Sequence, residues 1–147
     1  MSLKEKLMED LKNSMKNKDT LRKNTVTMVR ASIKQREVDE RIELTDEDII
    51  DIISKQVKEK RDVIVDFAKG GRDDLVKQTE QELDILLEYL PEQLTEEEIE
   101  AIVKETINEV GAKSMKDIGI IMKNVMPKVK GKADGGMVNK CVRKILG

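Results

Sequence analysis

The chain has 147 residues, of which 38% are hydrophobic and 39% are charged, and its net charge is −2 at pH 7. One Phe, one Tyr and no Trp leave a core of aliphatic side chains, which suits packing between helices better than packing between sheets. The absence of His excludes His-based acid–base catalysis and His metal ligands, and a single Cys excludes both an internal disulfide and a Cys/His zinc site.

The start of the chain alternates charged residues with Leu and lacks the apolar stretch of a secretory signal. No apolar run approaches the roughly 18 residues that a membrane span needs. The single cysteine, Cys141, fits a reducing compartment, and its apolar neighbours Val138 and Val142 indicate a buried thiol rather than a nucleophile. We therefore expect a cytoplasmic protein with no membrane contact, no cofactor and no metal.

Apolar residues recur with the helical period through residues 1–90 and predict four helices. The first follows a Ser2–Glu5 capping box, and the second starts near Asp19–Thr20. Residues 37–44 lose the period and are interpreted as a charged connection. The core-facing positions expected on these two helices are Leu3, Leu7, Leu11, Met15, Leu21, Met28, Val29 and Ile33.

A long third helix is predicted after a second capping pair, Thr45 and Asp48, and it is interrupted at Gly70–Gly71. The fourth runs from about Asp73 to Tyr89 and is stopped by Pro91. The pattern predicts an all-α protein in which residues 1–90 form an N-terminal four-helix bundle.

The segment Leu90–Leu94 is the predicted domain boundary, because a fresh helix start at Thr95–Glu98 follows its proline at once. That helix is expected to end at Gly111. Two short helices complete the chain, one over about Met115–Val125 that stops before Pro127, and one from Asp134. Residues 91–147 are therefore predicted to form a C-terminal three-helix bundle.

Charge is distributed unevenly along the chain. Residues 1–36 hold 10 Lys/Arg against 4 Asp/Glu, residues 37–110 hold 9 against 24, and residues 111–147 hold 9 against 2. Basic ends on an acidic middle would orient a polyanion such as a nucleic acid, or would simply help the ends dock on the middle. One basic run on the second helix is interpreted as a solvated face: Arg22, Lys23, Arg30, Lys34 and Arg36.

The segment Met126–Gly136 is predicted to be a Pro/Gly loop that runs into a helix N-terminus, where free N–H groups and the helix dipole attract phosphate. Gly135 and Gly136 would let a ligand backbone approach closely. The alternative is that Asp134 is an ordinary N-cap that occupies those N–H groups itself. Three lysines alternate along the loop, and with nearby cations they give a hypothetical RNA-binding set: Lys123, Lys128, Lys130, Gly131, Lys132, Lys140 and Arg143.

Two segments, Leu90–Thr95 and Met126–Asn139, resemble the signature segments of the GatB/YqeY family, and the likeness covers essentially the whole chain. The resemblance implies a four-helix bundle joined to a three-helix bundle. It also implies kinship with the C-terminal tail of the B subunit of aspartyl/glutamyl-tRNA amidotransferase, which contacts the tRNA body. By this likeness the lysines and Gly131 would face RNA, while other motif residues would shape the loop and helix: Ala133, Asp134, Gly135, Val138 and Asn139.

The chain lacks the large catalytic body of that B subunit, so the family's carbon–nitrogen ligase activity, with glutamine as amido donor, is not expected of it. The leading prediction is a tRNA-binding accessory protein that recognises backbone and shape, because scarce aromatic residues exclude base stacking. One alternative is a helical adaptor that docks an aminoacyl-tRNA synthetase or an amidotransferase. Another is a component that raises the activity of the amidotransferase.

Overall fold

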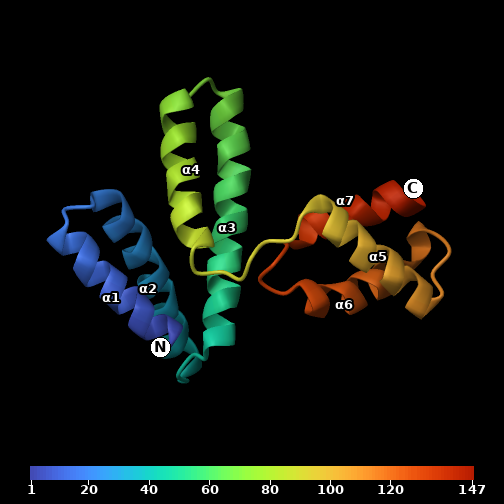
Figure 1. The fold of residues 1–147 in the computed structure, drawn as a ribbon, viewed down its shortest axis with the longest axis horizontal. Coiled ribbons are helices and arrows are strands. Elements are labelled where there is room, and N and C mark those ends of the chain that lie inside the picture. Colours follow the sequence, from blue (N-terminus) through green and yellow to red (C-terminus); the bar gives the residue numbers. More distant parts are fainter. The chain divides into compact units, whose positions relative to one another are not determined.

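The computed structural model describes all residues from Met1 to Gly147, and it contains seven α-helices, one short 3-10 helix and no strand. The all-α prediction is confirmed. The chain divides into two compact units, Met1–Leu90 and Pro91–Gly147 (Figure 1). No helix combines the length and the apolar character that crossing a membrane requires.

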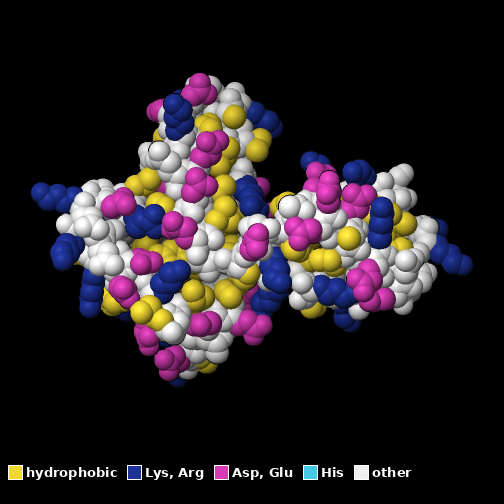
Figure 2. Space-filling model, in the orientation of Figure 1, with side chains coloured by type: hydrophobic (Ala, Val, Ile, Leu, Met, Phe, Trp, Pro, Cys, Tyr) yellow, Lys and Arg dark blue, Asp and Glu magenta, His cyan; other side chains and the backbone are white.

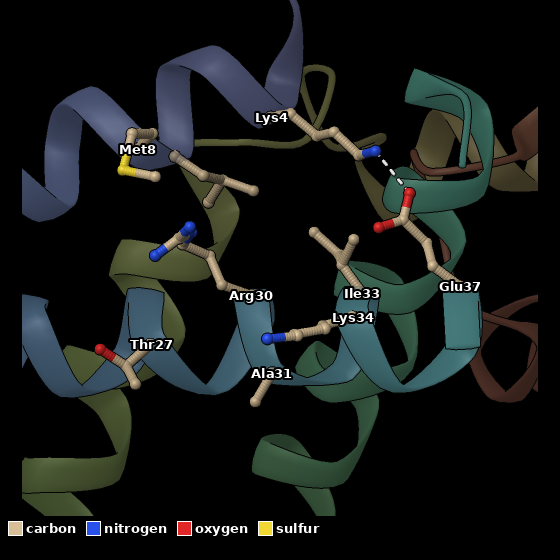
Figure 3. Close-up of a pocket in the computed structure, with 9 residues that line it drawn as sticks. Lys4, Met8, Thr27, Arg30, Ala31, Ile33, Lys34 and Glu37 are labelled. Carbon is tan, nitrogen blue, oxygen red and sulfur yellow. Dashed lines mark hydrogen bonds and ion pairs between the residues drawn. The ribbon is translucent and has the colours of Figure 1, made fainter. Parts of the chain in front are cut away.

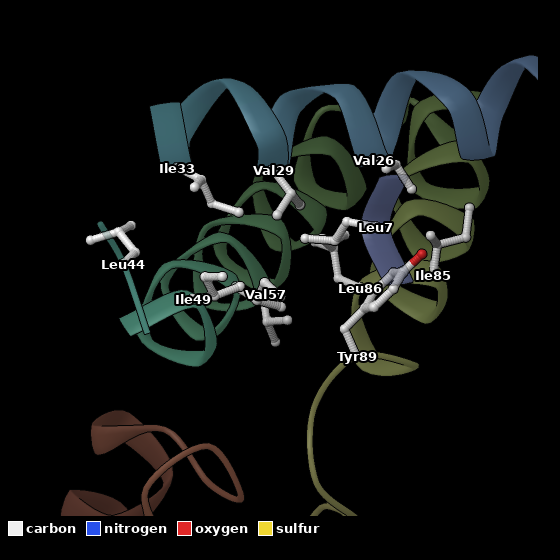
Figure 4. Packing of buried hydrophobic residues seen from close by; sticks show 11 residues of the cluster. Leu7, Val26, Val29, Ile33, Leu44, Ile49, Val57, Ile85, Leu86 and Tyr89 are labelled. Atoms are coloured by element: carbon white, nitrogen blue, oxygen red, sulfur yellow. The ribbon is translucent and has the colours of Figure 1, made fainter. Parts of the chain in front are cut away.

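Four helices make up the first unit: α1 (Leu3–Lys16), α2 (Thr20–Glu40), α3 (Asp46–Lys69) and α4 (Asp73–Leu87). Helices α1 and α2 pack against each other, α3 packs along α4, and α2 joins the two pairs by contacting α3 and α4. The core between them is aliphatic apart from Tyr89 (Figure 4) and includes Leu7, Val26, Val29, Ile33, Leu44, Ile49, Ile53, Val57, Ile85 and Leu86.

Side-chain caps begin three of these helices, α1, α2 and α3, where the sequence predicts helix starts, whereas α4 has none. Ser2 Oγ accepts from the Glu5 N–H at 3.2 Å, and Asp19 Oδ1 accepts from the Arg22 N–H at 3.2 Å. At the start of α3 the Thr45 hydroxyl and the Asp48 carboxylate each accept from the other residue's N–H. Each cap satisfies donors that the first helical turn would otherwise leave unpaired.

The predicted charged connection over residues 37–44 is wrong at its start, because α2 continues to Glu40. Glu37 lies on the last turns of that helix, where its carboxylate accepts from Lys4 Nζ and from the Leu44 N–H at 2.9 Å. These bonds tie α2 to α1 and fix the turn into α3. The helix then ends at Arg41, whose φ of 54° is left-handed.

Two predicted core residues, Met15 and Met28, are 56% exposed. The positions that α1 and α2 bury instead are Ser14 and Thr25, whose hydroxyls donate to the carbonyls of earlier residues on the same helix. Because these hydroxyls are paired within the helix, burying them costs little. Hydrophobicity alone therefore assigned the wrong face at both positions.

The second unit contains α5 (Glu96–Val110), the 3-10 helix η1 (Met115–Asp117), α6 (Ile118–Val129) and α7 (Gly135–Leu146). A reciprocal Thr95–Glu98 capping box starts α5, and Gly111, with φ of 68°, ends it, as predicted. Its core is aliphatic with one thiol: Ile99, Val103, Ile107, Ile121, Val125, Val129, Ala133, Val138, Cys141 and Val142.

The prediction that the helix before Pro127 stops there is wrong, because α6 runs through Pro127 to Val129. Proline removes one backbone hydrogen bond and crowds the preceding turn. Val125 and Val129, four residues apart, are both fully buried on the same helix face. Burial of Val129 therefore offsets the cost of the proline, and the predicted loop over residues 126–136 shortens to the turn Lys130–Asp134.

Candidate nucleic-acid interface

The turn Lys130–Asp134 joins α6 to α7 and is fixed by its own backbone. Gly131 has a φ of 75°, a left-handed conformation that favours glycine. The N–H groups of Lys132 and Ala133 both donate to the Val129 carbonyl, at 2.8 and 3.1 Å. Ala133 is buried in the core, whereas Lys132 is exposed, so the turn presents its lysine to solvent from a fixed backbone.

The segment after the unit boundary holds this turn from the other side. The Leu94 N–H donates to the Lys132 carbonyl at 2.9 Å. The Gln93 amide donates to the Gly131 carbonyl at 2.7 Å and to the Pro91 carbonyl at 2.9 Å. The two segments that carry the family resemblance are therefore bonded to each other. No spacing in the sequence indicates this pairing, which joins residues 38 positions apart.

Asp134 is the N-cap of α7, and its carboxylate accepts from the Met137 N–H at 2.8 Å. A carboxylate therefore already lies at the helix end where the sequence suggested a bound phosphate, and like charge would oppose a second anion there. A Cβ added at Gly136 would lie 3.1 Å from the Asp134 carboxylate, so that glycine leaves room for the cap. The N-cap interpretation is the one that the geometry favours.

Lys128 is not part of the turn. It lies on α6, and its Nζ donates to Thr106 Oγ1 at 3.0 Å and to Glu109 Oε2 at 2.9 Å, both on α5. The buried Thr106 hydroxyl also donates to the Ile102 carbonyl at 2.9 Å, so Lys128 adds a second bond to a hydroxyl already paired within α5. The sequence missed Thr106 and Glu109, because their contact with Lys128 arises only from the packing of α5 against α6.

The other predicted cations are exposed, and they are spread over three elements: Lys123 on α6, Lys130 and Lys132 in the turn, and Lys140 and Arg143 on α7. Lys140 and Arg143 are three residues apart and share one face of α7. The Arg143 Nε donates to Asn139 Oδ1 at 2.7 Å, which leaves the guanidinium charge without a carboxylate partner. Of the remaining motif residues, Val138 is fully buried in the core and Gly135 is the first residue of α7.

Acidic side chains of α5 neutralise part of this basic region. Residues 91–110 hold seven Asp/Glu and one Lys/Arg. Besides the Lys128–Glu109 pair, Glu100 lies 3.9 Å from Lys144 and 3.5 Å from Lys104. On the visible face of this unit, acidic side chains lie among the Lys and Arg side chains (Figure 2). Positive charge is therefore available on the turn, α6 and α7 rather than over the whole unit.

Two arginines of the predicted basic run on α2 are paired inside the first unit. The Arg22 guanidinium contacts Glu88 at 2.5 Å, and this hydrogen bond raises the pKa of Arg22. Arg36 contacts Glu40 at 2.6 Å, which likewise raises its pKa. The alternative that opposite charges help segments dock therefore holds for these side chains.

Cys141 is 5% exposed in the core of the second unit. Burial, with the nearby charges of Glu96 and Glu100, raises the pKa of its thiol. The thiol is thus protonated and shielded, which opposes a nucleophilic role. No group of three or more Cys, Asp or Glu side chains is arranged to hold a metal ion.

Curated relatives are similar in sequence to this chain over differing lengths. A protein of Pyrenophora tritici-repentis named Altered inheritance of mitochondria protein 41, mitochondrial, is 33% identical over 97% of this chain and 80% of its own length. Proteins of the same name from Kluyveromyces lactis and Lachancea thermotolerans are 38% and 36% identical over 56% and 71% of this chain. The chain spans 45% and 57% of the lengths of these last two.

These names correct the expected location. The relatives are named as mitochondrial proteins, so the comparison contradicts the prediction of a cytoplasmic protein. That prediction rested on the start of the chain, the lack of a long apolar run and the single cysteine; the cysteine indicates a reducing environment, which is not specific to the cytoplasm.

The likeness in the motif segments extends to the whole chain. The family model described as Yqey-like protein matches residues 4–146, which include both compact units and the turn between α6 and α7. The chain belongs to the YqeY-like protein family.

Proposed function

We propose that this protein is a tRNA-binding accessory protein, related to the tail of the tRNA-dependent amidotransferase and without a catalytic site of its own. In this proposal residues 1–90 form a four-helix bundle and residues 91–147 form the three-helix bundle that contacts RNA. The observation that carries the proposal is a fixed turn that exposes Lys130 and Lys132 and leads directly into a helix bearing Lys140 and Arg143.

The backbone of the turn supports this role because it needs little ordering on binding. Gly131, Lys132 and Ala133 are held by bonds to Val129, Gln93 and Leu94. Lysine side chains on a fixed backbone can contact phosphates with less entropy lost than on a mobile loop. Such contacts position a nucleic acid without reading its bases.

Recognition by backbone and shape is proposed because residues 91–147 contain no Phe, Tyr or Trp on which a base could stack. Tyr89 is 5% exposed, and its hydroxyl donates to Asp10 inside the first unit, so it offers no ring for a base to stack on. Arginine and lysine contacts to phosphates are then the main source of affinity, and affinity should fall steeply with salt. A folded tRNA presents closely spaced phosphates that suit a small basic surface.

The proposal revises the predicted contact set. Lys128 belongs to the fold, because it is bonded to Thr106 and Glu109, and Asp134 belongs to the helix cap. The cations proposed to contact phosphate are Lys123, Lys130, Lys132, Lys140 and Arg143.

Charge reversal at three of these positions tests the proposal: Lys132→Glu, Lys140→Glu and Arg143→Glu in one variant. We expect tRNA affinity to fall by more than about tenfold at low salt, and the salt slope to flatten by about one ion per lost contact. The matched control reverses the charge of three exposed lysines of α3: Lys55, Lys58 and Lys69. Its affinity for tRNA should stay higher than that of the test variant. Equal affinities of the two triple variants would refute the site.

The adaptor alternative makes a different prediction. A synthetase or amidotransferase that binds the protein directly should remain bound after RNase treatment, whereas a partner bridged by tRNA should be released.

A further inference from the structure

A groove of about 600 Å³ lies between α1 and α2 in the first unit (Figure 3). Its apolar lining includes Leu7 and Met8 from α1, and Ala31 and Ile33 from α2. Leu7 and Ile33 are buried in the core beneath it, whereas Met8 is 37% exposed. A methionine at such a site can adapt its shape to an apolar ligand. A volume of about 600 Å³ is large enough to accept several apolar side chains.

The charge around this groove is positive. Arg30 and Lys34 line it from α2, and neither makes an ion pair or a side-chain hydrogen bond in the structure. Glu37 is the acidic residue in the lining, and its carboxylate is already bonded to Lys4 and to the Leu44 N–H. Two other arginines of the same helix, Arg22 and Arg36, have acidic partners, whereas Arg30 and Lys34 have none.

We propose that this groove binds an acidic amphipathic helix of a partner protein. Apolar side chains of that helix would insert between Met8 and Ala31, and its carboxylates would pair with Arg30 and Lys34. The two cations are four residues apart on α2, which separates them by about 6 Å along the helix axis. Carboxylates one helical turn apart on the partner have the same spacing. The proposal is independent of RNA binding by the second unit.

A peptide suits the groove better than an RNA does. Phosphates would gain from Arg30 and Lys34 but would leave the apolar wall at Met8 unused. An amphipathic helix uses both features, because its apolar face enters the groove while its acidic flanks meet the charged rim. Arginine can bind a carboxylate through two parallel hydrogen bonds, which adds orientation to the contact.

The probe for the test is a fluorescein-labelled synthetic helix of about 18 residues, with Leu at the helical period and Glu on both flanks. The control peptide keeps the leucines and replaces each Glu by Lys. We expect the acidic peptide to bind the full chain and the basic peptide to bind at least about tenfold more weakly. Amide shifts of an isotope-labelled protein should move along α1 and α2.

Two variants locate the binding. Arg30→Glu with Lys34→Glu should lower the affinity for the acidic peptide by at least about tenfold, because two attractive charge pairs become repulsive. Met8→Glu, which places a carboxylate at an exposed position of the groove, should weaken it as well. The matched control, Lys55→Glu with Lys58→Glu on α3, makes the same change of charge outside the groove and should leave the affinity within about twofold. Circular dichroism checks that every variant is folded.

Three results would overturn the proposal. One is no binding of the acidic peptide to the folded protein, and another is equal weakening by the groove variant and the α3 control. The third is loss of tRNA affinity in the groove variant without any peptide binding, which would assign the groove to RNA. Failure of tRNA binding at the second unit, with peptide binding retained, would refute the proposed function and leave this inference intact.

Discussion

The two units use their basic residues differently. In the first unit, Arg22 and Arg36 are paired with carboxylates of the same unit. In the second, Lys128 is paired in this way, whereas Lys132 and Lys140 are exposed and have no acidic partner. Each unit therefore holds both paired and unpaired cations. In the first unit, Arg30 and Lys34 are unpaired beside an apolar groove, whereas in the second, Lys132 and Lys140 are unpaired on the turn and on α7. Charge counts along a sequence do not distinguish these uses; packing does.

The largest expected effect is a loss of stability in the first unit that leaves RNA binding unchanged. Leu86 is fully buried in the first unit, and Leu86→Ala should reduce the free energy of unfolding by about 3 kcal/mol, through lost burial and the cavity left behind. Affinity for tRNA should stay unchanged at temperatures where the variant is folded, because no contact of the second unit is altered. Denaturant unfolding and a tRNA titration measure the two quantities. A parallel loss of affinity in the folded variant would place RNA contacts on the first unit.

A smaller effect should distinguish two lysines of the second unit. Lys128→Met should lower the free energy of unfolding by about 1 kcal/mol, because the bonds from Lys128 to Thr106 and Glu109 are lost, although the Thr106 hydroxyl keeps its own bond to the Ile102 carbonyl. Lys132→Met should leave the free energy of unfolding within about 0.5 kcal/mol of the wild-type value and should lower the affinity for tRNA instead. Chemical denaturation and tRNA titration of both variants make the comparison. If Lys128→Met proves the more harmful to binding, then the proposed internal role of Lys128 is wrong.

Gln93 tests whether the fixed turn matters for binding. Gln93→Ala removes the hydrogen bonds from the side-chain amide to the Gly131 and Pro91 carbonyls. This loss should lower the free energy of unfolding by about 1 kcal/mol. The tRNA affinity should fall by a few-fold while the salt slope stays constant, because Gln93 positions lysines without contacting phosphate. A changed slope would show instead that a phosphate contact had been lost. Gln93→Glu, which keeps the size but not the donors, serves as a second variant.

The smallest effect concerns the acid sensitivity of the first unit. The hydrogen bond from Lys4 and the Leu44 N–H lower the pKa of Glu37 below its ordinary value. A carboxyl group with a lowered pKa contributes stability above its unfolded-state pKa, and that contribution is lost as the pH falls through the folded-state pKa. Glu37→Gln should therefore flatten the loss of thermal stability on acidification below about pH 4.5. Identical acid profiles for the variant and the wild type would show that the pair has no role in stability.

Local chemistry made the helix starts predictable, because a cap such as Thr45–Asp48 or Thr95–Glu98 lies within four residues of sequence. Errors arose where distant packing decided the outcome. Burial of Val129 carries α6 through Pro127. The hydroxyl of Thr25, bonded within its own helix, occupies a position that hydrophobicity would not assign to the core.

The candidate site was predictable in the same limited way. The alternating lysines and the glycines identified the turn, and Gly131 does adopt a left-handed conformation. The pairing of Lys128 with Glu109 and the bond from Gln93 to Gly131 could not be read from spacing, because they join residues 19 and 38 positions apart. Sequence therefore found the segment, and packing decided which of its side chains are available to a ligand.

Titration of the unmodified protein with unfractionated tRNA, at low and at physiological salt, measures whether the chain binds RNA at all. We expect binding at low salt that weakens steeply as salt is raised, with a slope of about three to five released ions for the exposed cations of the second unit. No binding at low salt would contradict the proposal that the turn and α7 form an RNA-binding surface, and would favour a protein partner.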